Sequence, residues 1–117
     1  MTPRLKASEH RQIQIERLRA ALSKMDTGPL LELFKEQAEI HFGGFFAIFY
    51  LGTHFKAAFG VLGFDVEGRG DVEDLPAFAT LKEAVIDAMA TVRTFWQEAD
   101  RDAIRAALVA KLETETA

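Results

Sequence analysis

The chain of 117 residues has no cysteine and only two serines. The lack of cysteine excludes disulfides, thiolate metal sites and a cysteine nucleophile. Ser8 and Ser23 lie in or beside a predicted helix, outside the strand-turn-helix setting that activates a serine nucleophile. No glycine-rich segment follows a strand, as a phosphate-binding loop would require. Nothing in the sequence therefore points to an enzyme, although these observations do not exclude one.

Long hydrophobic runs are also missing. The apolar segment 42–52 has eleven residues, whereas a membrane-spanning helix needs about 20. Acidic residues precede this segment, and His54 and Lys56 follow it within the length that a span would occupy. The basic N-terminus is not followed by the apolar run of a signal peptide. We therefore expect no integral membrane segment and predict a small acidic protein of the cytoplasm.

The charge is uneven along the chain. The net charge is −4, but residues 1–25 hold six Lys/Arg against Glu9 and Glu16, a local balance of +4, so the remainder carries −8. The basic segment has neither interleaved aromatic residues nor a helix-turn-helix pattern, so we do not expect a nucleic-acid partner. We predict that the basic residues form the solvent-exposed face of a helix, and that this helix packs against the acidic part of the same chain.

Apolar periodicity predicts an N-terminal helix over residues 8–25, with Ser8 as its N-cap. Its apolar face consists of Ile15, Leu18, Leu22 and Met25. The tetrapeptide 26–29, Asp-Thr-Gly-Pro, is predicted to end this helix and start the next one.

A three-to-four residue apolar spacing continues from Leu30 to Leu62 and predicts a long helix over 29–62, with Gly43-Gly44 as the place where it would kink or divide. Residues 63–76 form an acidic loop that resembles a calcium loop only until Arg69 and Pro76 replace two ligands. Asp74 would cap the helix that follows. Either one long helix covers 76–113, or the helix ends earlier and a further helix begins at residues 100–102.

These patterns predict an all-α single domain, residues 1–117, of three to four helices. The helices over 29–62 and 76–113 form a long antiparallel hairpin, and the helix over 8–25 packs beside it. No alternating segment looks long enough for a sheet. Such a hairpin buries one side of each helix, so dimerisation would complete the bundle. We expect 1–7 and 114–117 to be flexible.

The aromatic stretch 41–64, HFGGFFAIFYLGTHFKAAFGVLGF, is the candidate interaction surface. A helix that is apolar on all sides needs more neighbours than one short chain supplies. Small residues at positions 43 and 47 would let a second helix approach closely. We therefore predict a non-enzymatic regulator, adaptor or assembly subunit, a helical homo-oligomer that also binds another protein. The interface or pocket residues are Phe42, Gly43, Phe45, Phe46, Ala47, Phe49, Tyr50 and Phe55.

The alternative is a helical bundle that holds a small apolar or haem-like ligand among the same aromatic side chains. His41 and His54 are the candidate ligands, since imidazole binds haem iron. Thirteen residues separate them, which places them roughly 140° apart around one helix, so one helix cannot direct both at one ligand. No Glu-x-x-His pair suggests a di-iron site. Outside this alternative we expect no cofactor and no metal.

Overall fold

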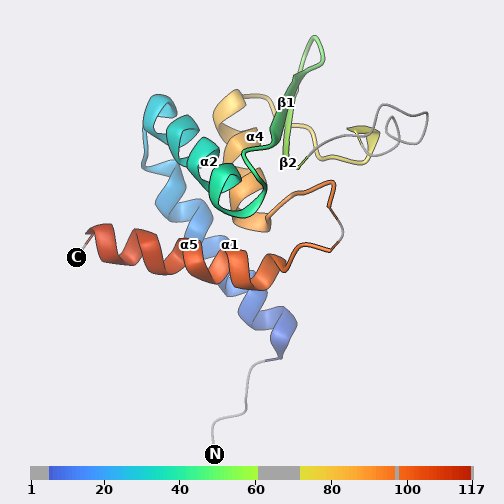
Figure 1. The fold of residues 1–117 in the computed structure, drawn as a ribbon. Helices are drawn as coiled ribbons and strands as arrows, with labels where there is room; N and C mark the ends of the chain where they lie inside the picture. The colour runs from blue at the N-terminus through green and yellow to red at the C-terminus, as the bar shows by residue number, and fades with distance from the viewer. Residues whose placement is uncertain (1–5, 61–71, 97, 117) are drawn as a thin grey trace, which may run out of the picture.

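The computed structural model describes residues 6–60, 72–96 and 98–116 and shows a mixed α/β fold (Figure 1). The elements are α1 (Ala7–Ser23), α2 (Thr27–His41), β1 (Phe46–Tyr50), β2 (Phe55–Phe59), α4 (Leu81–Thr91) and α5 (Arg101–Thr116). The all-α prediction is wrong, because β1 and β2 form an antiparallel hairpin where a helix was expected. This hairpin projects beyond the helices, and α5 crosses α1 (Figure 1). Most of the predicted acidic loop lies outside the described residues.

The N-terminal helix is confirmed as α1, but its cap differs from the prediction. Ser8 lies inside the first turn, and Lys6 is the N-cap. The carboxylate of Glu9 accepts a hydrogen bond from the backbone N–H of Lys6 at 3.1 Å, which satisfies one of the donors left over at a helix start. Leu18 and Leu22 are buried, as the apolar spacing predicted.

The predicted helix over 29–62 is wrong beyond His41. Helix α2 starts at Thr27, so Gly28 lies in its first turn. It ends before Gly43 and Gly44, whose φ angles of 63° and 87° are in the left-handed region that favours glycine and that a right-handed helix does not use. The sequence marked this position as a weak point, but the chain continues as a strand rather than as a second helix.

The two strands pair in a regular register from Phe46↔Phe59 to Tyr50↔Phe55, and Gly52, with a φ of 83°, lies in the turn between them. The outer edge of β2 is occupied at both ends. Phe55 exchanges two backbone hydrogen bonds with Phe78, of 2.8 and 2.9 Å. Phe59 donates to the carbonyl of residue 93 and accepts from the N–H of residue 95.

The segment predicted as one or two helices over 76–113 contains two, α4 and α5. Helix α4 is capped by Thr80, whose hydroxyl accepts from the N–H of Glu83 at 3.1 Å, so Asp74 is not its cap. It ends at Val92, which has a left-handed φ of 53°. Asp100 accepts from the N–H of Ala103 at 3.1 Å and caps α5, as the second reading of this segment predicted.

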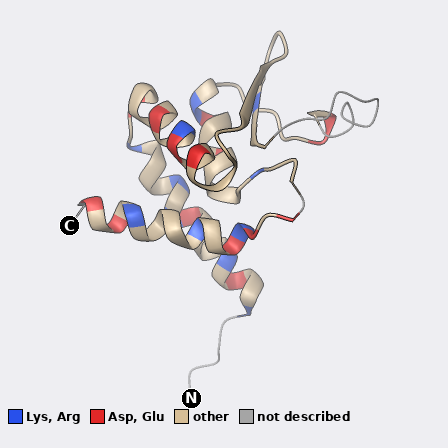
Figure 2. Ribbon diagram, viewed as in Figure 1, with Lys and Arg blue, Asp and Glu red and all other residues tan. Residues whose placement is uncertain are grey.

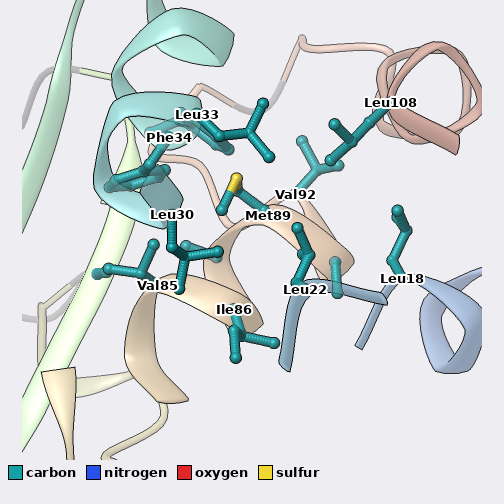
Figure 3. Close-up of a cluster of buried hydrophobic side chains, with 14 of the residues drawn as sticks. Leu18, Leu22, Leu30, Leu33, Phe34, Val85, Ile86, Met89, Val92 and Leu108 are labelled. Carbon is teal, nitrogen blue, oxygen red and sulfur yellow. The ribbon is translucent and has the colours of Figure 1, made fainter. Parts of the chain in front are cut away.

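The core forms around α4 (Figure 3). All seven residues from Ala84 to Ala90 are buried. Figure 3 shows the side chain of Met89 between Leu33 of α2 and Val92, with Leu22 of α1 nearby. On the other side of α2, Phe34 contacts Phe59 of β2 with ring centroids 4.7 Å apart. The ring of Phe46 in β1 also lies 5.0 Å from that of Phe34, so both strands of the hairpin contact α2.

Gly60 provides a test of how closely the chain packs after β2. Its φ is 91°, and an added Cβ would lie 3.2 Å from the indole of Trp96. We expect Gly60→Ala to lower the free energy of unfolding by about 1–3 kcal/mol, because strain and overpacking act together. Gly28→Ala is the control: its Cβ would meet nothing within 4 Å, and the helix favours alanine by up to about 1 kcal/mol. Urea unfolding measures the stability of both variants. Equal free energies of unfolding for the two would contradict the close packing of Gly60 against Trp96.

Candidate functional site

The outer edge of β1 is open among the described residues. Leu51 donates to the carbonyl of His54 and Gly60 donates to that of Phe45, which identifies the odd-numbered residues of this segment as the hydrogen-bonded partners of β2. In an antiparallel ladder the residues between them point their N–H and C=O groups to the other side. Three consecutive donor and acceptor sets, on residues 46, 48 and 50, therefore face away from β2.

Large apolar side chains accompany this open edge. Eight are exposed in the described part of the chain, and six of them lie between residues 40 and 51. The six are Ile40, Phe45, Phe46, Ile48, Tyr50 and Leu51. Ile40 belongs to α2, and the other five lie within residues 45–51, in or next to β1. Single exposed apolar residues are ordinary, but five within seven positions of one projecting segment indicate an interaction surface.

The usual protections of an edge strand are missing from β1. Natural edges are blunted by lysine, proline or a β-bulge. The segment 45–51, FFAIFYL, contains no charged residue and no proline, and its pairing with β2 runs through all five residues without a bulge. We define the surface made by this edge and its exposed side chains as the β1 surface.

The residues that the sequence predicted as one interface are divided by the fold. Phe42 is fully buried and stacks on Phe59 at a centroid distance of 4.7 Å. Phe55 is half-buried, and its ring lies 4.9 Å from that of the exposed Tyr50. Phe49 is half-buried, with its ring 6.5 Å from that of Phe95.

The rest of the predicted set lies around the open edge. Phe45 and Phe46 are exposed, and Ala47 is half-buried in β1. Gly43 belongs to the turn before β1, so it and Ala47 do not form the helical ridge that was expected. The aromatic segment is thus partly core and partly surface, and its members do not gather around one ligand.

The two candidate histidines are far apart in the fold and differ in setting. His41 is the last residue of α2 and lines a shallow pocket with Trp96 and Ile104. His54 lies in the hairpin turn, where its Nδ1 is 3.2 Å from the hydroxyl of Thr53. Among the described residues, no three His, Asp or Glu side chains are grouped so that they could hold a metal ion.

A second feature was not identified from the sequence: a cleft of about 650 Å³ between α1, the end of α4 and the start of α5. Five arginines line it, together with two aspartates and smaller residues. They are Arg11, Arg19, Arg93, Arg101 and Arg105. We call it the arginine cleft. Figure 2 shows basic and acidic segments side by side where α5 begins and crosses α1.

Two aspartates hold four of the five arginines of this cleft in place. Asp87, which is buried in α4, accepts from Arg19 at 3.2 Å through one oxygen and from Arg93 at 3.0 Å through the other. Asp102 accepts from both Arg11, at 3.0 and 3.1 Å, and Arg105, at 2.8 Å. Each carboxylate therefore joins two elements of the fold.

Arg105 also closes the end of α4. Its side chain is 2% exposed, and it donates to the carbonyls of Ala90 at 2.8 Å and Thr91 at 3.0 Å. Carbonyls at a helix end have no partner within the helix and favour a cation, so this contact stabilises the end of α4. Burial lowers the pKa of Arg105 from its ordinary value, with Asp102 acting in the opposite direction.

The prediction that the basic N-terminal segment packs against the chain's own acidic part is confirmed for three of its six cations. Arg11 pairs with Asp102, Arg19 with Asp87, and Arg17 with Glu113. The hydrogen bonds from Arg11 lower the pKa of Asp102 below its ordinary value.

No protein-family model, curated protein or solved structure matches this chain. Within the described ranges, every helix is too short or too polar to cross a bilayer. The candidate surfaces are therefore interpreted from their own chemistry.

The Asp102 ion pairs predict a pH-dependent stability. Because the pKa of Asp102 is lowered by folding, its charge stabilises the protein at neutral pH, and this contribution is lost as the pH falls through the folded-state value. We expect Asp102→Asn to lower the free energy of unfolding at neutral pH. The gap to the wild type should narrow at about pH 3, below the ordinary aspartate pKa of about 3.9, because the unfolded wild type then binds a proton more readily than the folded wild type does.

Urea unfolding at the two pH values measures this gap. Glu32→Gln is the matched control, since Glu32 is an exposed carboxylate of α2 without an ion pair in the described part of the chain. A gap for Asp102→Asn that stays the same from neutral to acid pH would contradict the pairing.

Proposed function

We propose that the protein is a non-enzymatic protein-binding module that self-associates through β1. In this arrangement β1 of one copy pairs antiparallel with β1 of a second copy, and two hairpins become one four-stranded sheet. The observation that carries the proposal is the open, uncharged and regular edge of β1, with its exposed apolar side chains. A strand whose outer edge is unpaired can accept a further strand along that edge.

The outward groups of β1 fit a two-fold axis at Ile48. Residues 46, 48 and 50 direct their backbone groups outward, so Ile48 would exchange hydrogen bonds with Ile48 of the second copy, and Phe46 with Tyr50. Each such pair makes two hydrogen bonds, which gives about six across the axis. The same axis brings aromatic side chains opposite one another, a favourable cross-strand pair.

A second copy suits this edge better than a charged partner strand does. The segment 45–51 has no charge, so antiparallel self-pairing brings no like charges together. A lone two-stranded sheet is marginal in water, whereas three or more strands with an apolar face are stable. Pairing also removes exposed side chains such as Ile48 and Tyr50 from water.

A dimer of this kind carries two copies of the helical part on one central sheet. We propose that the protein acts in this form as a regulator, adaptor or assembly subunit that presents its helices to a further protein partner. The lack of cysteine supports a place for it in a reducing compartment such as the cytoplasm.

Ile48→Lys tests the proposal, because it places two like charges opposite each other at the axis. We expect the dimer dissociation constant to rise by about thirtyfold, equivalent to ~2 kcal/mol, with helicity unchanged. Ile13→Lys is the matched control: Ile13 is an isoleucine of α1 with 43% exposure, compared with 37% for Ile48. Sedimentation equilibrium over a concentration series measures the constants.

The wild type should be dimeric at micromolar concentrations, and Ile13→Lys should match it. Two outcomes contradict the proposal: a wild type that stays monomeric at about 100 μM, far above the dissociation constant of an ordinary specific dimer, or equal weakening by both lysine variants.

A further inference from the structure

The arginine cleft holds an excess of positive charge in an acidic protein. Its five arginines carry +5, its lining aspartates Asp100 and Asp102 carry −2, and Asp87 behind Arg19 and Arg93 carries −1, so the balance is +5 − 3 = +2. The whole chain carries −4, so the other residues carry −6. Positive charge is therefore concentrated at one place, on side chains from three separate elements.

Most of the hydrogen-bonding capacity of these arginines is unused within the described residues. Five guanidinium groups present about 25 N–H donors. They make seven hydrogen bonds there, three of which come from the buried Arg105. Arg101 lines the cleft, is exposed and makes none of the seven. An oxygen-rich ligand would find several donors without breaking an existing contact.

Four of the five arginines, all except Arg101, are held before any ligand arrives. The carboxylate of Asp87, which is 2% exposed, fixes Arg19 and Arg93, and Asp102 fixes Arg11 against α5. Fixed side chains lose little conformational entropy on binding, so a ligand can use more of its interaction energy. The like charges of Arg11 and Arg101 also contribute to the lowered pKa of Arg105, which shows that positive charge is crowded in this region.

We propose that the arginine cleft binds the dianionic phosphate group of a small molecule. A dianion balances the +2 excess of the cleft, and tetrahedral phosphate oxygens accept from several guanidinium groups at once, whereas a carboxylate suits a single bidentate fork. The first turn of α5, which borders the cleft at Arg101, adds the positive end of a helix dipole. A volume of about 650 Å³ is within the range of small-molecule sites and leaves room for an organic group beyond the phosphate.

The carboxylates of the two lining aspartates are already hydrogen-bonded, which limits their electrostatic repulsion of a phosphate. Asp102 already accepts three hydrogen bonds from Arg11 and Arg105, and Asp100 accepts one from the N–H of Ala103. Arg19 and Arg93 each make one of the seven hydrogen bonds and Arg101 makes none, so these three have the most spare donors. We therefore place the phosphate among these three arginines.

Isothermal titration calorimetry at low ionic strength tests the proposal, with inorganic phosphate and pyrophosphate as probes and acetate as the carboxylate comparison. The wild type should bind both phosphate probes and bind acetate at least about tenfold more weakly. Arg101→Gln should weaken phosphate binding by about tenfold, the ordinary effect of losing a charged hydrogen bond, without changing the fold. Arg17→Gln is the control: it removes the same charge from α1, but Arg17 does not line this cleft.

Binding lost in Arg101→Gln and kept in Arg17→Gln supports the site. Three results overturn it: no binding of either probe to the wild type at millimolar concentration, acetate bound as tightly as phosphate, or equal weakening by both variants, which would show only general attraction to surface charge. A final experiment measures binding of the protein to phosphatidic acid vesicles. Tight vesicle binding without binding of the free probes would assign the surface to a membrane and overturn the small-molecule proposal.

Discussion

The burial of α4 sets the arrangement of the other helices and of β2. The seven residues from Ala84 to Ala90 are buried in succession, so this helix has no side that faces water along two turns. A helix of that kind is stable only when protein surrounds it. Helices α1, α2 and α5 and strand β2 all contact it. Small residues such as Ala84 and Ala88 allow these neighbours to approach closely, and Met89 fills the space between them (Figure 3).

The same helix connects the core to the arginine cleft. Asp87 is one of its seven buried residues, and an unpaired buried carboxylate is strongly unfavourable. Arg19 of α1 and Arg93 beyond the end of α4 supply the compensating charge. Packing α4 into the core therefore draws two arginines to one place, and the cleft is a consequence of how the core is built. Its other arginines arrive with α1 and α5, which contact each other beside it.

The sequence predicted α1 and α5 well, because α1 buries the periodic pair Leu18 and Leu22 and Asp100 caps α5. It named the wrong caps for α1 and α4. It failed over 42–60, where aromatic residues matched a helical spacing although the chain is a hairpin. Both faces of β1 carry apolar residues, so the alternation that reveals a strand is absent. Glycines at 43, 44, 52 and 60, all with positive φ, bracket the two strands and are the signal that was available. From the sequence, the aromatic segment was expected to be the helix that protein surrounds on all sides. In the structure that helix is α4.

The β1 surface and the arginine cleft both depend on residues 93–95, a short segment whose position the apolar periodicity of the sequence did not predict. The backbone of Arg93 accepts from Phe59 and that of Phe95 donates to it, so residues 93–95 close the outer edge of β2. The side chain of Arg93 meanwhile turns to Asp87 and lines the cleft. The five arginines span residues 11 to 105, and only tertiary packing joins them. Because this segment occupies the edge of β2, the strand edge that remains open within the described residues is that of β1.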